Sequence, residues 1–428
     1  MNKDLSKVPI LLVLFQYKLG EFFYNQFEIP QFEPLCEVVI YDLSLLTNPK
    51  WAQALSYDRS ARSNVITIAT WTSFFRHVSD LANIAATRPI SIRHFLPNSA
   101  AEMMITAFVS LTFLRRGAKQ FYMHNGGLPI PRTSIETNPT NTRDPILIAR
   151  FQSFLAHVSS LSELKTRVNF SINRYLARIF SGPITHQLAA GEHYVQEVLR
   201  FPNQRTKLVL GHSDDYSSYL RSLKHNPMHA SHITDLAVML DSNEPHSVGD
   251  DTLMNRPHAL TAANWFPAIT KLFDQLEAQT EVSIVIAGHY KSQLPPIPAC
   301  FGNRPVHYGK TLELIRSCKY VISRDSTAVS YAVIFRKPLI FIYSDEIESD
   351  GLVMQRLFYL AAFLGTQPAN INRLPSDLTT LLTVNEDRYK AYEKACLTST
   401  DRSRTNSQII LEDIMGISTT SGHRTPET

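Results

Sequence analysis

The segment from residue 308 to residue 342 constrains the fold of this 428-residue chain more than any other part. In it, a helical pattern is followed by a short apolar strand from Tyr320 to Ser323, a polar turn, a second helix and another apolar strand from Leu339 to Tyr343. Two buried strands connected by a helix predict a parallel sheet. The turn, Arg324-Asp325-Ser326-Thr327, then lies at the carboxyl end of a strand, where α/β sheets bind ligands.

The residues of this turn favour an anion. A helix that begins near Ser326 would leave its first backbone N–H groups without partners, and Asp325, Ser326 and Thr327 could supply caps and hydroxyl donors. A diphosphate would fit there. The alternative is that Asp325 or Ser326 only caps the helix, which needs no ligand.

Alternating strands and helices predict an α/β protein with two Rossmann-like domains that face a cleft. A chain of this length exceeds the size at which a single core keeps growing. In the first half we expect strands at Ile10 to Phe15, Glu37 to Tyr41, Val65 to Thr70, Ser91 to Phe95, Gln120 to His124 and Lys207 to Gly211, and helices at Ala100 to Arg116 and Ile184 to Leu199. In the second half we expect strands at Asp235 to Leu240, Val282 to Ala287, Val306 to Tyr308, Tyr320 to Ser323 and Leu339 to Tyr343, with a helix at Ala259 to Gln279.

These patterns divide the chain into five parts. We expect an N-terminal Rossmann-like domain over 1–215, a connection over 216–233 and a C-terminal Rossmann-like domain over 234–384. One or two polar helices should follow over 385–417. The residues 418–428 are rich in Ser, Thr and Pro and are expected to be disordered.

Composition argues against several classes of protein. The 42 Lys and Arg residues barely exceed the 38 Asp and Glu residues, and no dense basic run with aromatics indicates nucleic acid. Four widely spaced cysteines predict free thiols rather than zinc or disulfides. The apolar run from Pro9 to Phe15 is too short for a secretion signal, so a cytoplasmic protein is expected. The basic stretch from Lys165 to Arg178 could rest on the inner face of a membrane, although an ordinary surface helix explains it as well.

Three sequence segments carry a resemblance to a known family: Gly288-His289-Tyr290-Lys291, Gly309-Lys310-Thr311-Leu312-Glu313-Leu314-Ile315, and the stretch from Ser323 to Ala332 that precedes Lys337-Pro338-Leu339-Ile340. Together they resemble the second-domain signature of GT-B glycosyltransferases, especially those of bacterial surface-polysaccharide clusters, and more distantly of nucleotide-sugar 2-epimerases. The chain departs from this signature in one respect. Where many relatives place a ribose-binding glutamate, it has Ser330 and Tyr331.

The resemblance implies a GT-B-like enzyme that needs no cofactor. It would move a sugar from a nucleotide-sugar donor, bound by the second domain, to a saccharide or lipid-linked acceptor bound by the first. His289 and Lys291 follow one strand and the turn Arg324, Asp325, Ser326 and Thr327 follows another, so these six residues are the expected donor-binding residues. A cation such as Lys291, or else Arg324, would neutralise the diphosphate charge as the sugar leaves.

The acceptor hydroxyl needs a base, and four residues are candidates. Glu21 lies in the loop after the first strand, His94 and His124 follow later strands, and Asp241 follows the first strand of the second domain. The residues do not rank them, and structural roles remain open, including an Asx-turn for Asp241. Because no Asp-x-Asp follows a strand, we expect no essential metal. Two alternatives remain: a nucleotide-sugar epimerase, which would want more carboxylates, and a non-catalytic relative that assembles with polysaccharide enzymes.

Overall fold

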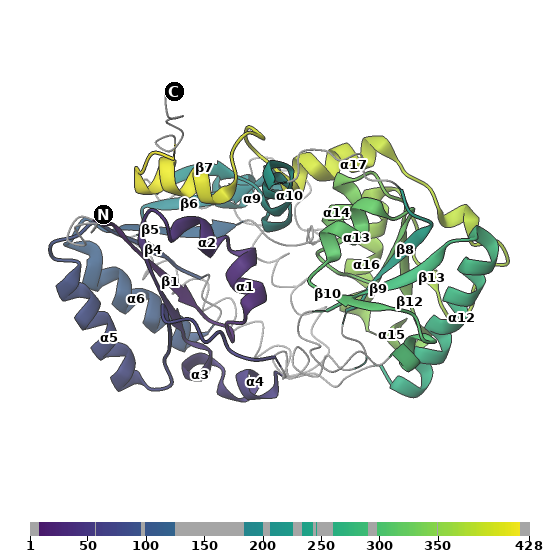
Figure 1. Cartoon of the computed structure of the whole chain (residues 1–428), viewed down its shortest axis with the longest axis horizontal. Coiled ribbons are helices and arrows are strands. Elements are labelled where there is room, and N and C mark those ends of the chain that lie inside the picture. The colour runs from purple at the N-terminus through teal and green to yellow at the C-terminus, as the bar shows by residue number, and fades with distance from the viewer. Residues whose placement is uncertain are drawn as a thin grey trace, which may run out of the picture.

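Two parallel β-sheets with flanking helices organise the chain (Figure 1). The computed structural model describes residues 8–55, 57–95, 99–124, 184–199, 206–225, 233–242, 245, 260–289, 298–348 and 350–419. Within these residues, one sheet belongs to the first half of the chain and the other to the second half. The expected α/β architecture with two Rossmann-like domains is confirmed by this topology.

The first sheet has the strand order β3-β2-β1-β4-β5-β6-β7. The chain moves outward from β1 to β3 and then returns to place β4 beside β1, so the strand order reverses between these two strands. Loops that leave β1 and β4 therefore diverge, as at the switch points where α/β sheets bind ligands. The strands are β1 (Ile10–Phe15), β2 (Glu37–Asp42), β3 (Val65–Thr67), β4 (Ile90–Arg93), β5 (Lys119–His124), β6 (His186–Ala190) and β7 (Lys207–Gly211).

Helices cover both faces of this sheet. On one face, α5 and α6 bury apolar side chains such as Phe74 and Val109 against the strands, and a Ser99–Glu102 capping box begins α6. On the other face, α1 and α2 pack with C-terminal residues of the chain. The helices of this half are α1 (Glu21–Gln26), α2 (Ile29–Phe32), α3 (Ser44–Thr47), α4 (Pro49–Ala54), α5 (Trp71–Ile84), α6 (Ala100–Leu114), α9 (Gly191–Leu199) and α10 (Asp214–His225).

The helix expected from Ile184 to Leu199 is wrong in its first part. Strand β6 occupies His186–Ala190 and pairs in parallel with both β5 and β7. Gly191 then adopts a φ of +71°, where α9 begins. A short apolar run does not reveal by itself whether it will be a strand, and here the two neighbouring strands decided.

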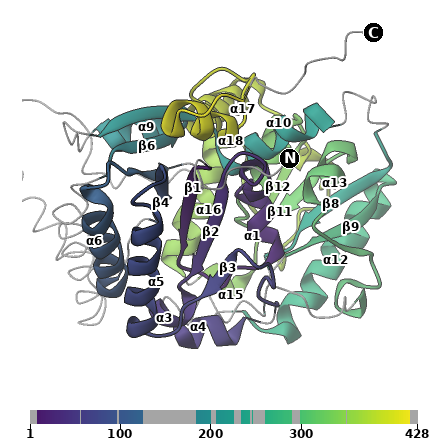
Figure 2. The ribbon, with the colours of Figure 1, turned by 60° about the vertical axis from the view of Figure 1, so that its left-hand side comes forward.

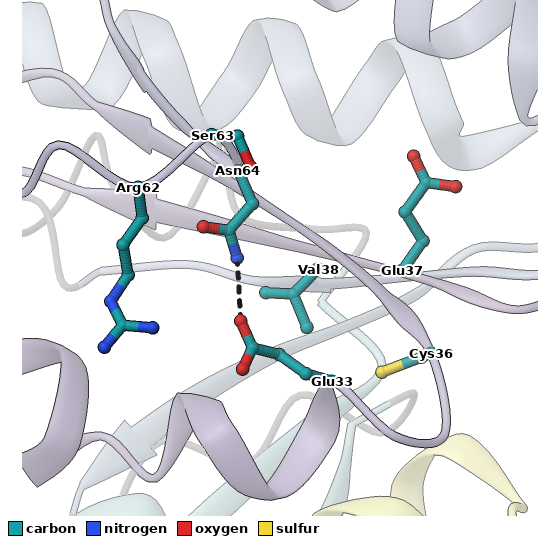
Figure 3. Close-up of a pocket in the computed structure, with 7 residues that line it drawn as sticks. All are labelled: Glu33, Cys36, Glu37, Val38, Arg62, Ser63 and Asn64. Carbon is teal, nitrogen blue, oxygen red and sulfur yellow. Dashed lines mark hydrogen bonds between the residues drawn. The ribbon is translucent and has the colours of Figure 1, made fainter.

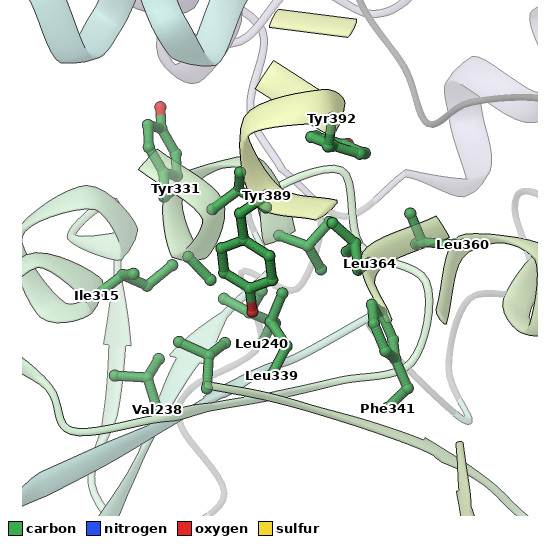
Figure 4. Packing of buried hydrophobic residues seen from close by; sticks show 14 of the residues in the cluster. Val238, Leu240, Ile315, Tyr331, Leu339, Phe341, Leu360, Leu364, Tyr389 and Tyr392 are labelled. Carbon is green, nitrogen blue, oxygen red and sulfur yellow. The ribbon is translucent and has the colours of Figure 1, made fainter. Parts of the chain in front are cut away.

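The second sheet has the order β10-β9-β8-β11-β12-β13. Apolar residues from β8, β11 and β12 pack against α14, α16 and α17 on one face (Figure 4), and α12 covers the other. The strands are β8 (Leu236–Leu240), β9 (Ser283–Gly288), β10 (Val306–Tyr308), β11 (Val321–Ser323), β12 (Leu339–Tyr343) and β13 (Ala369–Asn370). The helices are α12 (Ala262–Thr280), α13 (Thr311–Ser317), α14 (Val329–Ile334), α15 (Asp345–Glu348), α16 (Gly351–Leu364) and α17 (Glu386–Tyr392), with 3₁₀ turns at Pro298–Phe301 and Thr379–Leu381.

The C-terminal segment joins the two domains. α17 packs on the second sheet through Tyr389 and Tyr392, and the π-helical turn Glu393–Leu397 then lies against α9. Next, α18 (Asn406–Ile409) and the π-helical turn Ile410–Met415 bury their apolar side chains in the core of the first domain. Figure 2 shows this segment running over β6 and α9. The expected helices exist. α17 is polar on its exposed side, and the buried apolar side of the C-terminal helices completes cores formed by residues far away in the sequence.

Two further expectations concern membranes. In the described part of the chain, none of the helices combines the length and apolar character needed to cross a bilayer. The basic stretch from Lys165 to Arg178 lies outside the described residues, as do residues 420–428 of the tail.

Candidate functional site

Three serine hydroxyls are buried at the carboxyl edge of the second sheet. Ser323 ends β11, Ser344 directly follows β12, and Ser242 lies two residues beyond β8, and these three strands are neighbours. Each Oγ is buried without a hydrogen bond to any residue that the structure describes. Leaving a buried hydroxyl unpaired costs about 1–3 kcal/mol. Three such groups at the ligand-binding edge of one sheet are typical of a polar ligand site.

The turn after β11 differs from the helix start that the sequence predicts. α14 begins at Val329 rather than near Ser326, and the residue before it makes no side-chain cap. Ser326 Oγ instead accepts a hydrogen bond from the Ala328 N–H at 3.3 Å. Arg324 Nε lies 3.0 Å from Asp325 Oδ1, and both side chains are largely buried. The turn is therefore built by local polar contacts, and the Arg324 charge has a carboxylate partner.

Asp241 and His289 are brought together at the ends of neighbouring strands. The His289 backbone N–H donates to Asp241 Oδ2 at 3.3 Å, next to the pairing of β8 with β9. Burial, and then the Asp241 charge, raise the pKa of the Tyr308 hydroxyl, which lies at the end of β10. Lys291 lies outside the described residues. The ends of β8, β9, β10 and β11 thus gather Asp241, His289 and the 324–327 turn at one edge.

His94 is buried at the carboxyl end of β4, only 3% exposed. Its Nε2 lies 2.9 Å from Gln120 Oε1, while the Gln120 amide nitrogen donates to the Ser110 carbonyl. The proton of a neutral imidazole is therefore assigned to Nε2. Burial lowers the pKa of His94 to about 4, despite this hydrogen bond. A neutral, enclosed imidazole with so low a pKa is a poor base for an acceptor hydroxyl at neutral pH.

His124 and Glu21 have different surroundings. His124 ends β5, the strand beside β4, and is partly exposed. Glu21 lies on the surface of α1, where Arg62 Nη2 approaches its carboxylate at 2.9 Å and Ser60 Oγ at 2.7 Å. The hydrogen bonds from Arg62, and next from Ser60, hold the pKa of Glu21 below its ordinary value. Such a stabilised carboxylate is a weak base, so His124 is better placed than Glu21 or His94.

A shallow groove is lined in part by Arg62, the residue that pairs with Glu21 (Figure 3). It has a volume of about 430 Å³. Its wall includes a hydrogen bond of 3.2 Å from the Asn64 amide to Glu33 (Figure 3). Because Glu37 begins β2 and Asn64 precedes β3, the groove is at the amino edge of the first sheet, opposite to the ligand-binding edge. The groove is lined by Glu33, Cys36, Glu37, Val38, Arg62, Ser63 and Asn64.

The two domains meet at Asp215, the last residue of the expected N-terminal domain, for which the sequence predicts no role in the site. Asp215 lies in the first turn of α10 and accepts a hydrogen bond from Ser330 Oγ in α14. Burial raises the pKa of Asp215 to about 6, although hydrogen bonds from Ser330 and Tyr331 act in the opposite direction. The Tyr331 hydroxyl points away from the aliphatic core (Figure 4). Ser330 and Tyr331 thus both contact a carboxylate from the other domain.

Sequence reasoning missed several residues of this region. Ser242, Ser323, Ser344 and Arg93 each end a strand or closely follow one, which was the available signal. Their hydrogen-bonding state depends on packing, and no motif encodes it. In the part of the chain that the structure describes, no group of three or more His, Cys, Asp and Glu residues could hold a metal ion.

Comparisons with known proteins give structural likeness at low identity. No protein-family model matches the chain, and no curated protein sequence matches it. Among solved structures, a Listeria monocytogenes protein assigned as a UDP-N-acetylglucosamine 2-epimerase is 9% identical, with 99% of each chain covered and a TM-score of 0.46. The wall teichoic acid polymerase TagF is 10% identical over 96% of this chain and 90% of its own, with a TM-score of 0.45. MurG of Acinetobacter baumannii is 10% identical over 96% of this chain and 100% of its own, with a TM-score of 0.42. Because these TM-scores are below 0.5, we base the functional proposal on the residues of this chain.

Proposed function

We propose that this protein is a metal-independent glycosyltransferase. It takes a sugar from a nucleotide-sugar donor bound at the carboxyl edge of the second sheet and transfers it to a saccharide or lipid-linked acceptor held by the first domain. The observation that carries the proposal is the set of three buried, unpartnered hydroxyls of Ser242, Ser323 and Ser344. The proposed location is the cytoplasm, with acceptors presented at the inner face of the membrane.

The three hydroxyls suit the oxygens of a diphosphate. A hydroxyl that finds no protein acceptor can donate to a phosphoryl oxygen, and such charge-assisted hydrogen bonds are stronger than neutral ones. The open turn at Ser326 and Thr327, which follows Ser323 directly, adds further hydroxyls. These donors would stabilise the negative charge that grows on the leaving group, which is the charge a transferase without a metal must neutralise.

The proposed reaction is a substitution at the anomeric carbon. The acceptor hydroxyl oxygen bonds to that carbon, the bond from the carbon to the diphosphate oxygen breaks, and the nucleoside diphosphate leaves with the bonding pair. The hydroxyl proton passes to a base. Among the candidates, His124 and Asp241 lie at strand ends and are partly exposed. His94 is buried, and Glu21 is bound by Arg62. We therefore assign the base to one of these two residues.

Calorimetric titration with a panel of nucleotide sugars tests the donor site. The double substitution Ser323→Ala and Ser344→Ala should weaken binding of the accepted donor at least tenfold, because each hydrogen bond to a charged group contributes about 1.5–3 kcal/mol. The pair Asp325→Ala and Ser326→Ala tests the turn in the same way. Ser63→Ala is the matched control, since Ser63 is exposed at the amino edge. Equal affinities in all four proteins would refute the site.

A second experiment separates transfer from epimerisation. The protein is incubated with its donor in deuterated water, with and without an acceptor panel. A transferase leaves the sugar ring free of deuterium and releases nucleoside diphosphate only when an acceptor is present. Deuterium in the ring would instead establish proton transfer at carbon, the reaction of the epimerase alternative.

A further inference from the structure

Arg93 ends β4, beside the position where the strand order of the first sheet reverses. Its guanidinium lies 4.3 Å from the centre of the Phe27 ring. Arg93 makes this ring contact, but no hydrogen bond or ion pair joins its side chain to a residue that the structure describes. A guanidinium carries five N–H donors. Arg93 is partly buried, and removing charged donors from water without an anionic partner is costly. An arginine at this edge with no ion pair to a described residue therefore suits an anionic ligand.

The other enclosed guanidinium groups of the described chain have carboxylate partners. Arg59 pairs with Asp42, and Arg304 lies 2.8 Å from Asp274. The same holds for Arg88 with Glu37 at 2.7 Å and for Arg324 with Asp325 at 3.0 Å. Arg93 is the exception in this set.

Two carboxylates, those of Asp214 and Glu28, act electrostatically on Arg93. Burial lowers the pKa of the Arg93 guanidinium, while the charges of Asp214 and Glu28 act in the opposite direction. Glu28 is already bound by other groups. Its carboxylate accepts from the Ser407 N–H at 2.8 Å and lies 3.8 Å from Arg221 Nε. The two negative charges thus offset part of the effect of burial, and no hydrogen bond to a described residue occupies the Arg93 donors.

A chain of contacts connects Arg93 with the turn of the second domain. The charge of Asp214 acts on Arg93. Asp214 is adjacent to Asp215 in the first turn of α10. Asp215 binds the Ser330 hydroxyl across the domain contact, and the Ser330 N–H donates to the Thr327 carbonyl at 3.2 Å. The cation of the first domain and the 324–327 turn of the second therefore flank the same interdomain contact.

We propose that Arg93 binds phosphoryl oxygens of a substrate that lies between the two domains. This inference rests on the proposed function and adds to it the missing counter-charge from the first domain. The planar guanidinium fork matches two oxygens of one phosphate, which Lys cannot reproduce. The phosphoryl group belongs either to the donor diphosphate or to a phosphate-bearing acceptor, and the experiment distinguishes these sources.

The test measures binding to the full chain and to Arg93→Gln and Arg93→Lys. The probes are UDP, UMP, inorganic pyrophosphate and farnesyl diphosphate. Arg93→Gln should weaken at least one diphosphate probe tenfold or more, and Arg93→Lys should restore only part of that loss. A loss of UDP binding that spares farnesyl diphosphate assigns the donor, and a loss of farnesyl diphosphate binding that spares UDP assigns the acceptor. Arg62→Gln is the control, because Arg62 forms an exposed ion pair.

Stability separates binding from a structural role. Because no ion pair joins Arg93 to a residue that the structure describes, and the substitution removes only the contact with the Phe27 ring, Arg93→Gln should leave the thermal midpoint nearly unchanged. The proposal is overturned if Arg93→Gln binds every probe as the wild type does, if the wild type binds none of them, or if the variant loses stability in proportion to binding. If the serine variants weaken UDP while Arg93→Gln does not, the donor site stands and only this inference fails. If UDP binds nowhere but pyrophosphate binding needs Arg93, the inference stands and the donor assignment fails.

Discussion

Replacing Asp215 by Asn should remove the pH dependence of stability that the Asp215 carboxyl group causes at the domain contact. The carboxylate of Asp215 is partly buried where α10 meets α14, and it accepts a hydrogen bond from Ser330. Burial raises its pKa to about 6 from an ordinary 3.8. The difference of about two units corresponds to a cost of about 3 kcal/mol for keeping the ionised group in the folded protein.

The direction of the effect follows from proton uptake. Between pH 4 and pH 6 the folded protein holds a proton on Asp215 that the unfolded chain has released, so stability falls as pH rises through this window and then levels off. Asn does not ionise, and the cost disappears. The free energy of unfolding of Asp215→Asn, relative to wild type, should therefore grow by about 2 kcal/mol between pH 4.5 and pH 8.

Urea denaturation at half-unit pH steps measures this difference. Asp387→Asn is the control, since Asp387 is exposed on α17 and its substitution should leave the pH profile unchanged. Ser330→Ala removes a hydrogen bond that lowers the pKa of Asp215 and should move the midpoint of the profile above 6. A constant difference between wild type and Asp215→Asn across the whole range would refute the reasoning.

Three other predictions concern the first domain and the cysteines. His212→Ala should lower the free energy of unfolding by about 2–4 kcal/mol in urea, because the buried ring bonds the C-terminal segment through both nitrogens; unchanged stability would contradict this. Gly191→Ala should lower the thermal midpoint clearly more than Gly117→Ala does. Both glycines have positive φ, but only at Gly191 would a methyl group overlap the Ala395 backbone; equal shifts of the two midpoints would contradict this prediction. Cys300 should react first with iodoacetamide, because the other three cysteines are buried and burial raises their thiol pKa to about 12; mass spectrometry of the native protein decides.

The sequence determined most of the framework. The strands at Ile10–Phe15, Lys207–Gly211, Val306–Tyr308 and Leu339–Tyr343 have the bounds expected from their apolar runs. Inner strands such as Ile10–Phe15 and Leu339–Tyr343 are buried on both faces, and their apolar runs predict them without knowledge of their neighbours. The same runs placed Asp241 and the 324–327 turn at strand ends, and with them the edge where the candidate site lies.

Packing decided what the sequence left open. Strand β6 forms between two partner strands, β5 and β7. The apolar sides of the C-terminal helices pack into a core that includes residues of β1, almost 400 positions earlier in the sequence. The candidate site depends on the same kind of distant contact: Asp215 is bound by Ser330, 115 positions away. Among the described residues, Arg93 has no carboxylate partner of the kind that Arg59 and Arg304 have. Local patterns fix strands and turns because these need only nearby residues. The charge state and the hydrogen-bonding state of a side chain depend on its surroundings, which only the tertiary structure assembles.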